Sequence, residues 1–446
     1  MISSLFIPRH RIKTILVLAL PIMTGMLSQS VLNIIDAAMV GSLGETALAG
    51  VGIGGYATFA ACALAMGLGS GVQAMVSRRK GEGKTNVMGE PLNAGILMTL
   101  VIGIPIILIV FSFSDFFLQL LSADSAVVAV ATPYFEMRVI GVFAVGFNFS
   151  FRGYWNGINR STVYMSTIIA MHVVNVAVSY CLIWGHLGLP EMGATGAGLG
   201  TTISLYMGSI IYAILCFKYA KPHGFMRHWP SATLLRTISR VALPNSIQQF
   251  LFALSLTVLF TIIGSVGTPE LAVAHVLITL ILFVILPSIG LGLAAATLVG
   301  QAMGRGDMVD ATRWGWDAVI IATILLASFG VPLCLFTDQV LGIFVHEPHL
   351  LELGRTPLRI TGVFIIFDAV AVILTQALLG AGAAKKVMQV NLVMQWMFFL
   401  PTVWLVGPVL GYGLVGIWIV QALQRGITSY LFMHIWRQRE WQTVKV

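Results

Sequence analysis

The sequence predicts an all-α membrane protein with twelve transmembrane helices. Of its 446 residues, 58% are hydrophobic and only 9% are charged, whereas a soluble domain carries about 25% charged residues. The apolar runs are about 20 residues or longer, which is enough to cross the roughly 30 Å core of a bilayer as a helix. The alternating segments of about ten residues that are typical of membrane β-barrels are not found. An ordinary soluble enzyme is therefore excluded.

The apolar runs, taken in order between polar breaks, give six expected helices in each half of the chain. In the first half these are 14–40, 46–76, 91–115, 130–154, 162–185 and 194–218. In the second half they are 238–264, 270–299, 314–337, 352–379, 386–409 and 411–436. The longest polar connection contains KPHGFMRHWP and separates the two sets. We expect an N-terminal six-helix lobe at 1–218, a cytoplasmic linker at 219–237 and a C-terminal six-helix lobe at 238–446.

The placement of positive charge indicates how the chain crosses the membrane. With both termini in the cytoplasm, most of the 25 Lys and Arg residues fall in cytoplasmic loops and ends, as the positive-inside rule requires. This placement explains the net charge of +8 without a nucleic-acid partner. The four cysteines lie in or beside apolar runs without metal-ligand spacing, so we expect neither a metal nor a cofactor. We expect a multi-pass protein of a bacterial inner membrane.

The two halves of the chain are repeats of one another. A shift of 223 positions aligns residues 19–83 with 242–306 without a gap. The matches include Ala19-Leu20-Pro21 with Ala242-Leu243-Pro244, and Gly67-Leu68-Gly69 with Gly290-Leu291-Gly292. Each half has an even number of helices, so both begin on the same side of the membrane, as in transporters with parallel repeats. We therefore expect two pseudo-symmetric six-helix bundles.

Ionisable residues inside the expected helices are the main candidates for function. Three lie deep: Asp36 in the first helix, Asp368 in the tenth and Arg425 in the twelfth. An Asp at the centre of a membrane helix costs about 2.5–3.5 kcal/mol to insert, so it usually faces a polar cavity or a partner. Such an acid can hold either a proton or a cationic ligand, which is what an exchanger requires. Arg425 could pair with an acid or extend its charge toward the interface.

Polar residues accompany Asp36 in the first half. Asn33 lies one helical turn before it on the same face, and other helices add side chains that could line a hydrated pocket with it. These candidates are Asn148, Asn175, Ser179 and Thr201. The repeat counterpart of Asp36 is Leu259, so the second half lacks this acid. The alternative is a structural Asp bonded to its neighbours.

Pro21 precedes Asp36 in the same expected helix. Because proline removes a backbone hydrogen bond and clashes with the preceding turn, we expect a kink at this position. Our hypothesis is that protonation of Asp36 biases the helix between straighter and more bent forms. A static kink is the alternative.

The sequence resembles the multidrug and toxic compound extrusion (MATE) family over nearly its whole length. The residues that carry the resemblance are LALPIM…NIIDAAMVGSLG, the repeated GLGSG…RRKGEG and GLGLAA…GQAMGRGD, and NVAVSYCLIWG. The resemblance implies two lobes that form a V-shaped cavity, and a monomer in the lipid bilayer. It also implies export of organic cations and other amphipathic drugs by antiport, with Asp36 as the coupling acid beneath Pro21.

Two departures from the family bear on the coupling ion. The DinF-type branch, which the chain resembles most closely, often has a second Asp where Ser179 stands. The NorM-type branch shares an Asp at position 368 but places a Glu about where Phe252 stands. Each carboxylate pair is thus only half present. Since Na⁺ usually needs several hard oxygen ligands whereas one acid suffices for a proton, we expect H⁺ as the coupling ion, with Na⁺ as the alternative.

Three other classes of membrane protein fit the sequence less well. A lipid-linked saccharide flippase of the same superfamily needs a cationic cavity for its anionic headgroup, and here the deep charges are two acids and one Arg. A membrane enzyme would carry a catalytic cluster, and P-loop, HExxH and GxSxG motifs are not found. A channel is less consistent with two asymmetric halves and one lone acid.

Overall fold

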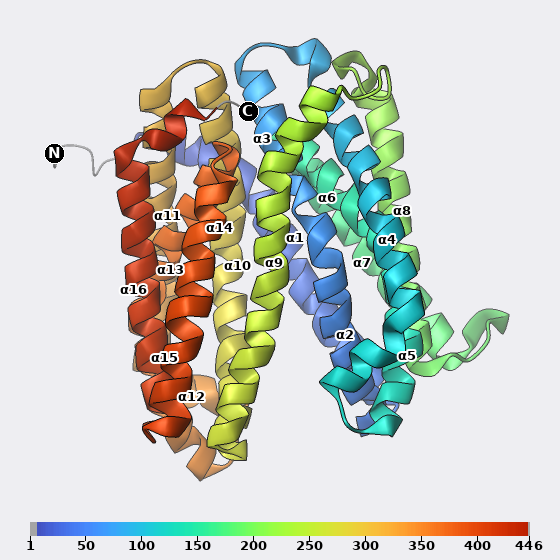
Figure 1. Ribbon diagram of the computed structural model, residues 1–446, viewed down its shortest axis with the longest axis vertical. Coiled ribbons are helices and arrows are strands. Elements are labelled where there is room, and N and C mark those ends of the chain that lie inside the picture. Colours follow the sequence, from blue (N-terminus) through green and yellow to red (C-terminus); the bar gives the residue numbers. More distant parts are fainter. Residues whose placement is uncertain (1–6, 445–446) are drawn as a thin grey trace. The chain divides into compact units, whose positions relative to one another are not determined.

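The computed structural model describes residues 7–444, which form helices joined by short loops (Figure 1). The first half contains α1 (Arg9–Gly41), α2 (Glu45–Met66), α3 (Leu68–Gly81), η1 (Thr85–Val87), α4 (Glu90–Leu121), α5 (Ser125–Val139), α6 (Val142–Gly157), α7 (Ser161–Trp184), η2 (His186–Gly188), α8 (Gly193–Tyr219) and η3 (Lys221–His223). The second half contains α9 (Ala232–Val266), α10 (Thr268–Gly304), α11 (Met308–Leu335), α12 (Thr337–Gly342), α13 (Pro348–Gly380), α14 (Ala384–Leu392), η4 (Val393–Phe399), α15 (Leu400–Trp404), η5 (Leu405–Val409), α16 (Gly413–Gln438) and η6 (Glu440–Thr443). Because residues 7–444 contain no strand, the all-α prediction is confirmed.

Each of the twelve expected helices has a counterpart, although several are interrupted. Within the described chain, ten helices are long and apolar enough to cross a membrane, and the pair α5–α6, bent by 47°, would make an eleventh. Helix α16 has 26 residues and coincides with the twelfth expected helix. The eleventh helix contains two π-helical segments, η4 and η5, close to Pro401 and Pro408. Proline cannot donate a backbone hydrogen bond, so the helical ladder shifts locally there.

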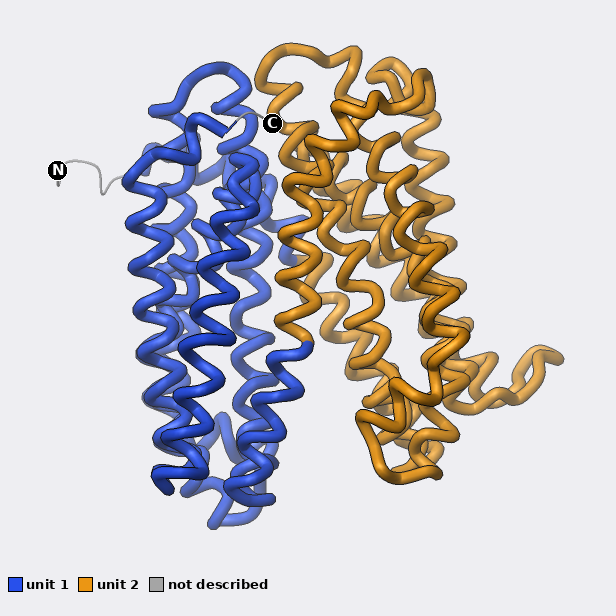
Figure 2. The backbone as a smooth tube through the Cα atoms, in the orientation of Figure 1, with its two compact units in different colours: residues 1–23, 254–445 blue, residues 24–253, 446 orange. Residues whose placement is uncertain are grey.

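The chain forms two compact units (Figure 2). Unit 2 is Thr24–Ala253, and unit 1 combines the chain up to Met23 with the chain from Leu254 onward. Within unit 2, α6 packs against α3, α4 and α8, while α7 packs along α8. Within unit 1, α13 packs against α10, α11 and α16. The division into lobes at the 219–237 linker stays a prediction, because the boundaries between these units fall inside two helices.

Helices α1 and α9 each pass from one unit into the other. The start of α9 packs on the α2–α3 break of unit 2: a Cβ on Gly67 would lie 2.6 Å from the Ser246 amide nitrogen. The start of α1 packs on α10 in unit 1: a Cβ on Gly290 would lie 2.6 Å from Met23 Cγ. Gly67 and Gly290 are counterparts in the repeat, and so are Met23 and Ser246. The two halves therefore exchange the first parts of their first helices, and α1 continues unbroken through Pro21.

A buried ion cluster attaches the start of α1 to α11 in unit 1. The Arg11 side chain donates from Nε to Asp317 and from Nη1 to Asp310, the latter at 2.6 Å. Its guanidinium also lies 3.6 Å from the centroid of the Trp314 ring. Since Arg11 and Asp317 are both buried, each charge depends on the other for compensation. This cluster fixes the first turns of α1 to unit 1.

Candidate functional site

Asp36 is a half-buried acid in the part of α1 that belongs to unit 2. Its Oδ1 atom is buried and has no hydrogen-bond partner among the described residues. Arg138, near the end of α5, lies close enough to interact with it electrostatically. Two guanidinium nitrogens of Arg138, Nε and Nη1, are also buried without a partner in the described structure. An acid and a nearby cation thus each keep buried polar atoms without a hydrogen bond among the described residues, which is unusual.

A second group of polar side chains lies on α7 and α8. Asn175 and Ser179 are buried on α7. The Asn175 amide donates to Ser204 Oγ at 3.4 Å, and its carbonyl oxygen accepts from Ser179 Oγ at 3.5 Å. These distances are long for hydrogen bonds, so Asn175 is only loosely bonded. Thr201 instead donates to the Ala197 carbonyl of its own helix.

The remaining predicted residues of the first half are bonded elsewhere. Asn148 donates to the Leu205 carbonyl at 3.0 Å and accepts from Ser209 Oγ at 2.9 Å. Asn33 is exposed and accepts from the Gln29 amide at 3.1 Å. Both side chains therefore have a hydrogen-bond partner within unit 2.

His172 connects α7 to α1. Its Nδ1 lies 3.0 Å from Ser28 Oγ and its Nε2 lies 3.0 Å from Gln29 Oε1. Because Gln29 in turn donates to Asn33, a chain of hydrogen bonds runs along α1 toward the turn that carries Asp36. These hydrogen bonds hold the segment of α1 that precedes Asp36 against α7.

In unit 1 the deep acid and the deep base form an ion pair. Arg425 Nη1 on α16 lies 2.8 Å from Asp368 Oδ2 on α13, and the two side chains are 8% and 13% exposed. Ser429, one turn further along α16, donates to the Phe367 carbonyl. In the π-helical segment η4, Gln395 donates to Ser255 Oγ and accepts from Gln424. Asp368 is thus already compensated by a cation of its own unit.

The two predicted acids therefore differ in their surroundings. Both have a buried carboxylate oxygen without a hydrogen bond among the described residues. Asp368, however, forms an ion pair with Arg425, one of the two roles expected for that arginine, whereas Asp36 has no ion-pair partner within residues 7–444. Arg138 was missed as a neighbour of Asp36, because a single Arg at the end of an apolar run resembles an ordinary loop-side charge. Among residues 7–444, no three His, Cys, Asp or Glu side chains form a group that could hold a metal ion.

This fold, with its repeated helical halves and acids inside its membrane helices, is that of a secondary transporter. The MatE family profile matches residues 21–181 and again 244–405. These two matches begin at the same offset as the repeat in the sequence. The chain therefore belongs to the MatE family, and the predicted family resemblance is confirmed.

Known proteins of similar sequence and fold support this assignment. The chain is 26% identical over 440 residues to a probable multidrug resistance protein NorM of Synechococcus sp., covering 95% of this chain and 93% of that protein. It is 27% identical over 415 residues to a protein of the same description from Bradyrhizobium diazoefficiens, covering 90% and 88%. Its fold matches that of a solved structure described as the outward-facing conformation of a multidrug resistance MATE family transporter of the MOP superfamily. That match has a TM-score of 0.89 at 22% identity and covers 98% and 97% of the two chains.

Proposed function

We propose that this protein exports organic cations and other amphipathic drugs in exchange for H⁺ that moves inward. The membership in the MatE family and the multidrug resistance descriptions of its relatives support the class of substrate. Proton coupling rests on Asp36, whose buried Oδ1 has no hydrogen-bond partner in the described structure. An acid in this state can take up either a proton or the positive charge of a ligand.

The contrast with Asp368 supports the choice of Asp36 as the coupling acid. A cation or a proton that binds Asp368 must first displace Arg425, which lies 2.8 Å away. Among the described residues Asp36 has no such direct ion pair, and Arg138 acts on it electrostatically. In our proposal Arg138 supplies a resident positive charge when Asp36 is ionised and empty. Proton or drug binding at Asp36 then competes with this interaction.

The path of α1 offers a way to couple Asp36 to transport. The boundary between the two units lies between Met23 and Thr24. It follows Pro21 by two residues, and Pro21 has no backbone N–H to donate to the helix. The start of α1 is held in unit 1 by Arg11, and the part with Asp36 belongs to unit 2. A change of bonding at Asp36 that bends α1 near Pro21 would therefore act on both units. Alternating access in transporters uses such movements between repeats.

The remaining parts of the proposal follow from the positive-inside rule and the family. We place the protein in a bacterial inner membrane with both termini in the cytoplasm and propose that it acts as a monomer. Na⁺ is the alternative coupling ion. The loosely bonded Asn175 would favour Na⁺, because Na⁺ needs several oxygen ligands and the side-chain carbonyl of Asn175 could supply one of them.

Ethidium export from reconstituted vesicles tests this proposal. A pH gradient or a Na⁺ gradient is imposed separately on wild type, Asp36→Asn and Asp115→Asn. Asp115 is a matched control, because it lies at the far end of α4 and bonds to Thr132. We expect export driven by the pH gradient in wild type and Asp115→Asn and its loss in Asp36→Asn. Export that requires Na⁺ would contradict proton coupling, and unchanged export by Asp36→Asn would contradict the role of Asp36.

A further inference from the structure

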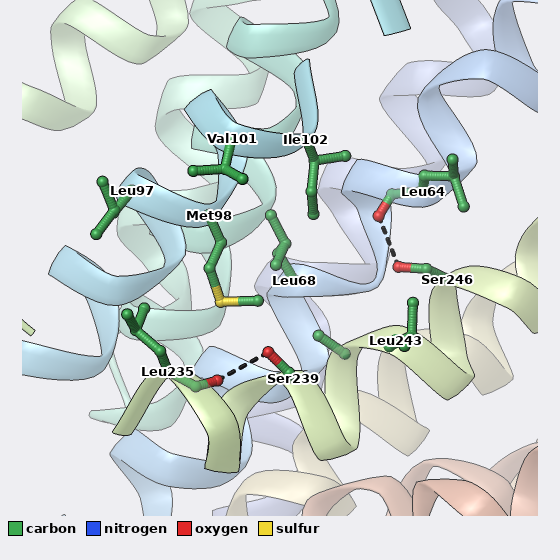
Figure 3. Close-up of a pocket in the computed structure, with 11 residues that line it drawn as sticks. Leu64, Leu68, Leu97, Met98, Val101, Ile102, Leu235, Ser239, Leu243 and Ser246 are labelled. Carbon is green, nitrogen blue, oxygen red and sulfur yellow. Dashed lines mark hydrogen bonds between the residues drawn. The ribbon is translucent and has the colours of Figure 1, made fainter. Parts of the chain in front are cut away.

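Unit 2 contains an apolar pocket of about 420 Å³ between α4 and the first part of α9 (Figure 3). Leu97, Met98 and Val101 line it from α4, and Leu235 and Leu243 line it from α9. Leu64 and Leu68, on either side of the α2–α3 break, complete the lining, as the close-up shows. All of these residues lie within Thr24–Ala253, so the pocket belongs to one unit.

The pocket has exposed apolar side chains at its edge. Val101 is 64% exposed and Leu243 is 56% exposed, and both lie on helices long and apolar enough to cross a membrane. Its two hydroxyls are already satisfied, because Ser239 donates to the Leu235 carbonyl at 2.8 Å and Ser246 to the Leu64 carbonyl at 2.6 Å. Because the remaining lining side chains are apolar and both hydroxyl protons are already donated, the pocket fits an apolar chain.

Two arginines on α9, Arg236 and Arg240, directly follow the pocket-lining residues Leu235 and Ser239. Arg236 and Arg240 precede Leu243 by seven and three residues, a spacing that places them on the same side of the helix. Arg236 is therefore about 10 Å from Leu243 along the helix axis. Both arginines are exposed, and neither has an ion-pair partner in the part of the chain that the structure describes. They leave two exposed positive charges on the side of α9 that carries the pocket-lining Leu243.

The loop before α9 has the features of a membrane interface. Trp229 is 86% exposed and Arg227 is exposed two residues before it. Exposed Trp is typical of the headgroup level of a bilayer. The arginines on the first turns of α9 would then lie at headgroup depth, and the apolar pocket at the depth of the acyl chains.

We propose that this pocket binds an acyl chain of an anionic phospholipid whose phosphate lies between Arg236 and Arg240. Basic pockets between membrane helices bind anionic headgroups in this way. An organic cation drug is disfavoured here, because the two arginines repel it. Since α9 leaves unit 2 at Ala253, the bound lipid would hold the start of α9 on α4 and so favour one arrangement of this crossing helix. This site is separate from Asp36 and does not depend on the coupling ion.

Native mass spectrometry of the purified full-length protein measures the proposed binding. The probes are dioleoyl phosphatidylglycerol and dioleoyl phosphatidylcholine, which share acyl chains and differ in headgroup charge. Arg236→Gln/Arg240→Gln should weaken phosphatidylglycerol binding about twenty-five-fold, at about fivefold per arginine, and leave phosphatidylcholine binding unchanged. The charge control is Arg313→Gln/Lys385→Gln, which removes two exposed cations of unit 1 and should change neither affinity.

The acyl chain is tested separately by filling the pocket. Val101→Trp should block binding of both lipids at this site, because the new side chain occupies the groove. Leu108→Trp is the matched control, since Leu108 is 63% exposed two turns further along the same face of α4 and does not line the pocket. A phosphatidylglycerol with a diazirine on its acyl chain should label α4 and α9 peptides in the control and not in Val101→Trp.

Three results would overturn the proposal. They are equal affinity for the two lipids in wild type, unchanged phosphatidylglycerol binding in the arginine variant, and label spread evenly over both units. Displacement of the labelled lipid by ethidium, without loss in the arginine variant, would identify a drug site instead.

Discussion

Replacing Asp368 alone should damage this protein more than replacing it together with Arg425. The two side chains form a pair with 2.8 Å between Nη1 and Oδ2 and are 13% and 8% exposed. In Asp368→Asn the Arg425 charge stays buried without its counter-ion. In Asp368→Asn/Arg425→Leu both charges are gone, and the leucine fills much of the space of the arginine stem.

The expected magnitudes follow from this burial. Breaking a buried pair by removing one partner costs about 3–5 kcal/mol, whereas replacing both partners by neutral groups is often close to neutral. At about 2–4 °C per kcal/mol for a unit of this size, Asp368→Asn should unfold roughly 10 °C below wild type. Arg425→Leu should lose less, because the remaining carboxyl can take up a proton and become neutral. The double variant should unfold within a few degrees of wild type.

Thermal unfolding of the purified protein in detergent measures these differences, and vesicle transport measures their consequence. The exposed pair Arg355–Asp338, with 2.7 Å between Nε and Oδ1 and side chains 45% and 53% exposed, serves as a control. Asp338→Asn should cost at most about 1 kcal/mol, as surface ion pairs do. Ethidium export should survive in the double variant, because Asp36 is still present.

Two outcomes would refute this reasoning. If Asp368→Asn unfolds at the wild-type temperature, the pair does not stabilise unit 1. If the double variant is stable but no longer exports ethidium under a pH gradient, Asp368 takes part in coupling and the assignment of that role to Asp36 alone is wrong.

Three further predictions test other parts of the structure. Arg138→Gln should bind tetraphenylphosphonium at least about fivefold more tightly in equilibrium binding, because a positive charge that acts on Asp36 no longer competes with the ligand. This competition is worth about 1–2 kcal/mol at intermediate polarity. Unchanged or weaker binding would contradict it. Gly67→Ala should lower the stability by about 1–3 kcal/mol, since its Cβ would lie 2.5 Å from the Ala242 carbonyl oxygen. The control Gly52→Ala on α2 should be neutral, because a Cβ there meets none of the described atoms within 4 Å. Equal melting temperatures for the two variants would show that α9 does not pack there. Burial and the nearby Arg160 lower the pKa of His223 below its ordinary value of 6.5, so the unfolded chain binds more protons between these two values and stability falls as pH drops below about 6.5. His223→Asn should make the melting temperature less dependent on pH between 7.5 and 5, and an unchanged pH dependence would contradict this assignment.

The membrane class, the helices and the repeat could be predicted because local sequence encodes them. A helix in a bilayer must satisfy its backbone hydrogen bonds internally and present apolar side chains to lipid, so length and hydropathy locate it without knowledge of its neighbours. The same reasoning identified Asp36, Asp368 and Arg425, since an ionisable group in an apolar run stands out in one dimension. The interruptions at Gly67 and near Pro401 were not located, because a short break in an apolar run leaves its hydropathy unchanged.

The partners of the charged residues depended on three-dimensional packing. Arg11 looks like a loop charge, yet it is buried against Asp317 from a helix of the other half of the chain. Arg138 approaches Asp36 from α5, whereas Arg425 pairs with Asp368 from α16. These pairings join residues far apart in the chain, and a side chain's charge and hydropathy are the same whichever partner it meets. Sequence therefore identifies the groups that must be compensated, and the packing of the helices determines which group compensates each of them and which acid has no ion pair in the described structure.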